Sequence, residues 1–193
     1  MSAVSKNSKD FSSQENGAII RFAPDMTRDQ VEFQRVMLIN QDPPDHTKIR
    51  QIISRGFTPR SINAQHDVLV QRANTIVDDV IAKGSGDFVS EVAAELPLQA
   101  IADLLGVPQE DRRKLFDWSN QMLAGDDPEY GGQPDVAAAE ILGYAMEMAA
   151  DRKVNPRDDL ITKLVQGDVD GQPLAEDEFG YFVIMLAVAG NET

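Results

Sequence analysis

The most informative stretch of the chain lies at residues 41–50 and reads QDPPDHTKIR. Two prolines that follow an aspartate are typical of the start of a helix. On that helix His46 and Arg50 are four residues apart, so their side chains lie on one face. An imidazole beside a guanidinium can donate hydrogen bonds to a pair of carboxylates. Taken alone, the spacing favours a plainer alternative, an exposed amphipathic helix with a capping histidine at its start.

A second informative stretch lies at residues 187–193 and reads AVAGNET. A glycine inside an apolar helix costs about 1 kcal/mol relative to alanine, so Gly190 needs a reason. The small residues Ala189 and Gly190 would let a helix pass close to a flat ligand. Glu192 and Thr193 form an acid–alcohol pair, and such groups can relay protons to a reacting atom. Taken alone, this stretch favours a helix–helix contact at Gly190 followed by a polar end.

Helical periodicity dominates the remaining sequence. A helix is predicted from Thr58, an N-cap before a proline, to the stop at Gly84, and its apolar face includes His66, which we expect in the core. A short strand is the only extended element expected, around residues 19–22. The fold class is therefore mainly α. The other predicted helices cover residues 98–105, 108 onward, 135–152, 159–165 and 176 onward.

Composition limits the class of protein. The 193 residues suffice for one domain with a sizeable core, and the net charge of −14 argues against nucleic acid or an anionic membrane as the main partner. No apolar stretch approaches the roughly 20 residues of a membrane span, and the polar start shows no signal peptide, so we expect a cytoplasmic protein. The last helix is still apolar where the sequence stops, which indicates a partial chain.

Together, the two informative stretches are far more specific than either alone. Residues 37–60 contain ML, DPPDHTKIR and SRGFTPR, residues 96–108 read LPLQAIADLLGVP, and residues 189–193 read AGNET. In their order and separation they resemble the helix C, helix E and helix I regions of bacterial cytochromes P-450. The resemblance implies that residues 1–193 are a single partial domain, a fragment of that mainly α fold running from before helix C into helix I. The N-terminal sheet region and the C-terminal haem-thiolate half would be absent.

Within this family, the chain is most similar to actinobacterial steroid side-chain hydroxylases. The supporting stretches are FSSQENG at residues 11–17, FDWSN at residues 116–120, and residues 179–193. These enzymes oxidise the terminal methyl of cholesterol or cholest-4-en-3-one. The resemblance therefore implies a sterol-like substrate, O2, and a haem b cofactor.

The resemblance also implies a role for each matching residue. His46 and Arg50 would bind the haem propionates. Ala189 and Gly190 would border the oxygen site, with Glu192 and Thr193 as the acid–alcohol pair. The residues that would line the substrate channel are Ile19, Ile20, Phe22 and Val188.

The redox partners implied by the family are a ferredoxin and its reductase. Lys48, Arg55 and Arg60 lie in a stretch without any acid between His46 and Arg60. Such a local basic surface can steer an acidic ferredoxin despite the overall negative charge. A solvated basic face without a partner is the alternative.

The sequence departs from the family in one chemical respect. The family ligates iron through a cysteine beyond helix I, and this chain has no cysteine and no assigned metal ligand. We therefore expect the 193 residues alone to lack monooxygenase activity. A different class of function stays open: a non-catalytic helical binding or scaffold protein derived from a P-450, or a pseudogene product.

Overall fold

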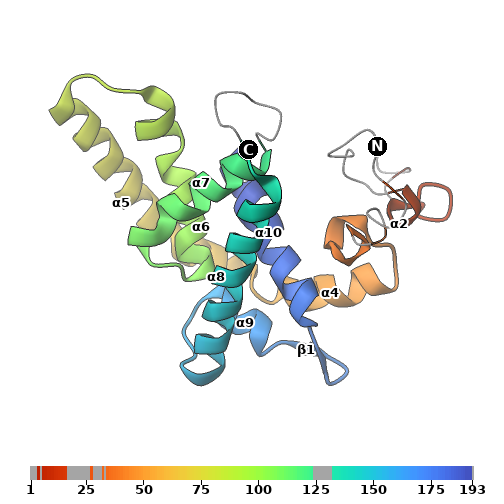
Figure 1. Cartoon of the computed structure of the whole chain (residues 1–193). Coiled ribbons are helices and arrows are strands. Elements are labelled where there is room, and N and C mark those ends of the chain that lie inside the picture. The colour runs from red at the N-terminus through yellow and green to blue at the C-terminus, as the bar shows by residue number, and fades with distance from the viewer. Residues whose placement is uncertain are drawn as a thin grey trace.

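The computed structural model describes residues 4, 6–16, 27, 32, 34–123 and 132–192, with the side chains of residues 169, 191 and 192 outside this description. The expected mainly α fold is confirmed (Figure 1). The α-helices are α2 (Ser13–Asn16), α4 (Asp45–Ser54), α5 (Pro59–Lys83), α6 (Glu95–Leu105), α7 (Arg112–Leu123), α8 (Pro134–Val154), α9 (Leu160–Val165) and α10 (Glu176–Glu192). The remaining elements are the 3-10 helices η1 (Gln34–Val36), η2 (Leu38–Asn40) and η4 (Gln109–Asp111), the π-helix η3 (Val89–Ala93), and the strands β1 (Asp168–Val169) and β2 (Gln172–Pro173).

Helix α10 runs through the middle of the molecule, where it packs against α6, α7 and α8 (Figure 1). The buried side chains of these helices form one core, to which α4 and α9 add their apolar faces. Burying each large aliphatic side chain stabilises the fold by about 1.5–3 kcal/mol. Fully buried members of this core are Ala102, Leu105, Ile141 and Ile161.

The ends of α5 lie where its sequence predicts them. The Thr58 hydroxyl accepts a hydrogen bond from the Ser61 amide at 3.2 Å, and Gly84 ends the helix in the left-handed region. The expected burial of His66 is wrong: its side chain is 75% exposed beside Asp67. Helix α5 packs on α6 along a narrow edge, and Ile76 is its only buried residue. Periodicity marked the apolar positions but could not tell which of them are covered here.

A buried ion pair joins three elements at the lower end of the bundle. Arg152, in the last turn of α8, donates to the Asp159 carboxylate at 2.6 Å and to the Gly106 carbonyl at 2.9 Å. Asp159 also caps α9 by accepting from the Thr162 amide at 2.8 Å. The ends of α6 and α8 and the start of α9 are therefore held together by charge-assisted hydrogen bonds.

The sequence predicted a turn at residues 170–171 but not the strands beside it. Asp170 and Gly171 both have positive φ, as a tight hairpin turn requires, and β1 pairs antiparallel with β2. The strand expected around residues 19–22 lies outside the described residues. Among the helices that the structure describes, none combines the length and apolar composition needed to cross a membrane.

Candidate functional site

Helix α4 presents two different faces. Ile49, Ile52 and Ile53 are buried and fix the helix to the core. His46 is half-buried and Arg50 is exposed, one turn apart as the sequence predicted. Because the isoleucines hold the helix in one orientation, His46 and Arg50 are presented on a common face.

The start of α4 is anchored by Asp42, a role that sequence reasoning missed. Its carboxylate accepts hydrogen bonds from the Ser12 hydroxyl at 2.6 Å and from the Ser13 amide at 3.1 Å. The Ser12 hydrogen bond is the main reason that the pKa of Asp42 lies below its usual value. The Asp42 carbonyl accepts from the His46 amide at 3.1 Å, so the carboxylate docks α2 onto the turn that carries His46. An aspartate before two prolines was the only local signal, because Ser12 lies 30 residues away.

The guanidinium of Arg50 is free to bind a carboxylate. It forms no hydrogen bond or ion pair with any residue in the described ranges. Arg55 and Arg60 are exposed as well, and Lys48 contacts Asp45 at 3.5 Å on the surface. The basic stretch expected from the sequence is therefore solvent-exposed.

Near the end of α10, Gly190 is explained by packing. A Cβ atom at this position would meet the side chain of Ile101 on α6, with Cγ1 only 2.6 Å away. The missing side chain lets α10 and α6 approach closely, which is the helix–helix contact weighed as an alternative. Ala189 lies on the exposed side of α10, and Val188 is half-buried against the core.

The other predicted site residues cannot be placed. Thr193 and the three predicted channel residues at positions 19, 20 and 22 lie outside the described residues, and so does the side chain of Glu192. Their roles stay predictions. His46 and Arg50 are together on α4, whereas residues 188–190 lie on α10.

A pocket of about 180 Å³ lies between α4, the β1–β2 hairpin and the start of α10. It is lined on α4 by Asp45, Lys48, Ile49 and Ile52, which is not the face that bears His46 and Arg50. The face proposed for cofactor carboxylates is therefore separate from this pocket.

The α4 face fits the carboxylate end of a haem. An exposed arginine without a described partner and a half-buried histidine one turn away can both donate to anionic propionates. Iron ligation is a different matter, since none of the 193 residues is a cysteine. The residues present therefore match the periphery of the cofactor, not its metal.

Comparison with known proteins gives a consistent result. No model of a known protein family matches the chain. The chain is 58% identical over 190 residues to a steroid C26-monooxygenase of Rhodococcus jostii, covering 98% of this chain and 40% of that protein. It is 56% identical over 191 residues to a steroid C26-monooxygenase of Mycobacterium tuberculosis, covering 98% and 44%.

Solved structures agree with the sequence relatives. A cytochrome P-450 of Mycobacterium marinum in complex with pseudoionone superimposes with a TM-score of 0.74 at 35% identity, over 83% of this chain and 41% of that one. A cytochrome P-450 of Bacillus megaterium in complex with testosterone gives a TM-score of 0.71 at 32% identity, over 81% and 43%.

These similarities define the class: the chain belongs to the cytochrome P-450 family, as a partial chain with a mainly α fold. The relatives that it matches over nearly its whole length are steroid C26-monooxygenases. The chain spans about 40–44% of the length of these curated relatives.

Proposed function

We propose that this chain is a section of a haem-dependent monooxygenase that hydroxylates the terminal methyl of a sterol side chain. The observation that carries the proposal is the 56–58% identity to steroid C26-monooxygenases over 98% of the chain. Identity to a methyl-branched lipid omega-hydroxylase of Mycobacterium tuberculosis is lower, 39% over 175 residues. A sterol is therefore favoured over a methyl-branched lipid as the substrate.

In this proposal the exposed face of α4 holds the cofactor by its carboxylates. The guanidinium of Arg50 and the imidazole of His46 would hold the haem by donating hydrogen bonds to its propionates. The bound haem supplies O2 activation and the oxidation of an unactivated C–H bond. The chain itself supplies position, since the buried isoleucines of α4 fix both donors relative to the core.

Proton delivery is assigned to the end of α10. The Glu192 carboxyl would take protons from solvent, and the Thr193 hydroxyl would hold a proton on the side of the helix where the cofactor would bind. Gly190 sets the position of this segment by letting α10 rest against Ile101. Exposed Ala189 would then leave room beside the porphyrin for O2.

Substrate binding is assigned to an apolar channel, because a long sterol needs a mostly pre-formed hydrophobic cavity. Its proposed lining residues are Ile19, Ile20, Phe22 and Val188. Electrons would come from a ferredoxin, itself reduced by a ferredoxin reductase. The exposed positive charges of Lys48, Arg55 and Arg60 support docking of an acidic protein at this surface.

A chimera tests the proposal directly. The matching 190 residues of the Rhodococcus jostii enzyme are replaced by this chain. The remainder of the Rhodococcus enzyme then supplies the rest of the fold, including its iron ligand. The reduced, carbon monoxide-bound spectrum first shows that haem is bound through a thiolate. Cholest-4-en-3-one should then shift the haem spectrum and be hydroxylated at the terminal methyl. A chimera with the thiolate spectrum but without sterol binding or turnover contradicts the proposal.

A further inference from the structure

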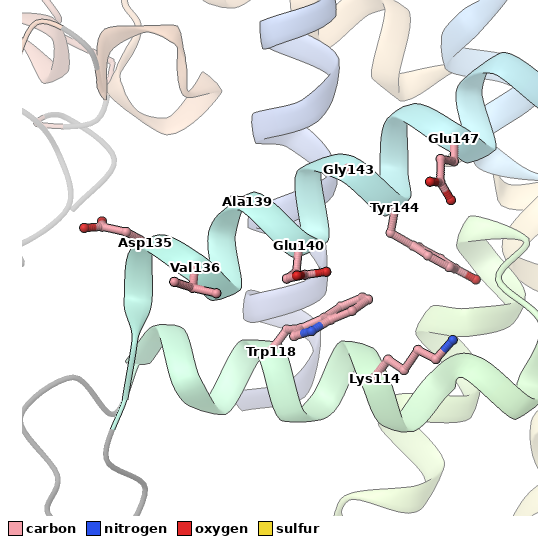
Figure 2. Close-up of a pocket in the computed structure, with 9 residues that line it drawn as sticks. All are labelled: Lys114, Trp118, Asp135, Val136, Ala139, Glu140, Gly143, Tyr144 and Glu147. Atoms are coloured by element: carbon pink, nitrogen blue, oxygen red, sulfur yellow. The ribbon is translucent and has the colours of Figure 1, made fainter.

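A groove of about 620 Å³ lies between α7 and α8, on a face that the proposed function does not use. Figure 2 shows Trp118 and Lys114 pointing from α7 toward α8, whose side chains form the opposite wall. The volume falls in the range of about 300–1,000 Å³ typical of small-molecule sites. Its remaining lining residues are Asp135, Val136, Ala139, Glu140, Gly143, Tyr144 and Glu147.

The wall of the groove is aromatic. The rings of Trp118 and Tyr144 lie 5.9 Å apart and are tilted by 56°. The Tyr144 hydroxyl donates to the Asp111 carboxylate at 2.8 Å, and burial together with this carboxylate raises the pKa of Tyr144. The phenol therefore stays protonated and holds its ring in place. An indole face of this kind attracts organic cations.

The charge of the groove is negative and uncompensated. Asp135, Glu140 and Glu147 form no ion pair with any residue that the structure describes. The one lysine in the groove, Lys114, is already bound to Asp111 at 2.8 Å. Two carboxylates beside the aromatic wall, Glu140 and Glu147, therefore lack a cation among the described residues, whereas Asp135 points away from Trp118 at the end of the groove (Figure 2).

The glycine at position 143 is a second feature that keeps the groove open. It lies in the middle of α8, where glycine weakens a helix relative to alanine. Packing does not explain it, since a Cβ at this position would meet no atom within 4 Å. Figure 2 shows Ala139 and Gly143 on α8 on either side of Glu140, and neither residue has a side chain large enough to fill the groove.

We propose that this groove binds a linear aliphatic polyamine. At a rise of 1.5 Å per residue, Glu140 and Glu147 are about 10 Å apart along α8 and, about two turns apart, lie on the same face. Ammonium groups separated by short methylene chains can contact such spaced carboxylates. The methylenes lie on the apolar floor, and one ammonium lies over the indole of Trp118.

The chain contains a built-in probe, because Trp118 is its only tryptophan. Titration of the 193-residue chain with spermidine should change the tryptophan fluorescence saturably. Magnesium chloride at the same ionic strength should not, because compact hydrated cations cannot use the aromatic wall. An equal response to magnesium would overturn the proposal, since screening of an acidic surface would then explain both results.

Matched variants test the assigned residues. Replacing both Glu140 and Glu147 by glutamine should weaken spermidine binding about fivefold, from the loss of two partly exposed ion pairs. The same charge change at Asp78 and Asp79, both exposed on α5, should leave affinity within about twofold. Similar affinities for the two double variants would refute the site.

A third variant separates binding from folding. In Gly143→Leu the new side chain points into open space, and leucine favours a helix more than glycine does. The far-ultraviolet circular dichroism spectrum of the variant should therefore match that of the parent chain. Its side chain fills the floor of the groove and should abolish the spermidine response. A Gly143→Leu chain that binds as tightly as the parent contradicts the proposed position.

Discussion

Replacing Arg152 by methionine tests the energetics of the buried ion pair. Arg152 is 2% exposed and Asp159 is 6% exposed, so neither charge is hydrated. The guanidinium also donates to the carbonyl of Gly106 at 2.9 Å and to the carboxylate of Asp151. Methionine keeps much of the side-chain volume but leaves the Asp159 carboxylate with only its cap to the Thr162 amide.

The expected loss is large because removing one partner leaves a buried charge uncompensated. Such changes cost about 3–5 kcal/mol. For a domain of this size each kcal/mol lowers the melting temperature by roughly 2–4 °C, so Arg152→Met should lower it by roughly 6–20 °C. The double variant Arg152→Met, Asp159→Asn should be more stable than the sum of the two single losses predicts, because no orphaned charge remains.

Urea unfolding of the 193-residue chain, followed by circular dichroism, measures these values. Arg157→Met is the matched control, since Arg157 is largely exposed and contacts Asp151 at 3.3 Å. Its loss should stay below about 1 kcal/mol. If Arg152→Met costs no more than Arg157→Met, the ion pair does not hold the three elements together and the reasoning fails.

Three further predictions concern other parts of the chain. The pKa of Asp42, measured by carbon-13 NMR, should lie below about 3.9 and rise toward it in Ser12→Ala. Because the pKa of Asp42 is lower in the folded state, its stabilisation is complete at a pH above the unfolded-state pKa. The stabilisation is lost as the pH falls through the folded-state pKa. An unchanged pKa of Asp42 in Ser12→Ala contradicts this account. Gly190→Ala should lower the free energy of unfolding by about 1–3 kcal/mol, because the added methyl group clashes with Ile101. Ile101→Ala in the same chain should relieve that clash, so additive losses in the double variant would argue against the contact. The chain supplied with haem should show no thiolate-type carbon monoxide band, because it has no cysteine; such a band would overturn this expectation.

Local chemistry made most helix ends predictable. The Thr58 cap and the left-handed Gly84 and Gly106 act within a few residues of their own positions, so the sequence alone locates both ends of α5 and the C-terminal end of α6. The start of α6 was predicted at residue 98 but lies at Glu95. The two-residue strands of the hairpin are too short to produce a periodic pattern. Sequence reasoning therefore found their turn but not the strands.

Tertiary contacts explain what sequence could not predict. Asp42 acts through Ser12, and Gly190 acts through Ile101, both far away along the chain. The exposure of His66 depends on which edge of α5 meets α6, and the helical period cannot identify that edge. Among the candidate site residues, the shared face of His46 and Arg50 follows from their spacing, whereas the partner of Gly190 lies on another helix and cannot be identified from the sequence.

A crystal structure of the chimera with haem and cholest-4-en-3-one bound would test most directly whether α4 and α10 enclose the cofactor. We expect propionate oxygens within about 2.7–3.2 Å of the Arg50 guanidinium and the His46 imidazole, with Ala189 beside the porphyrin. The opposite result, in which the His46–Arg50 face points to solvent while other residues hold the propionates, would contradict the functional assignment.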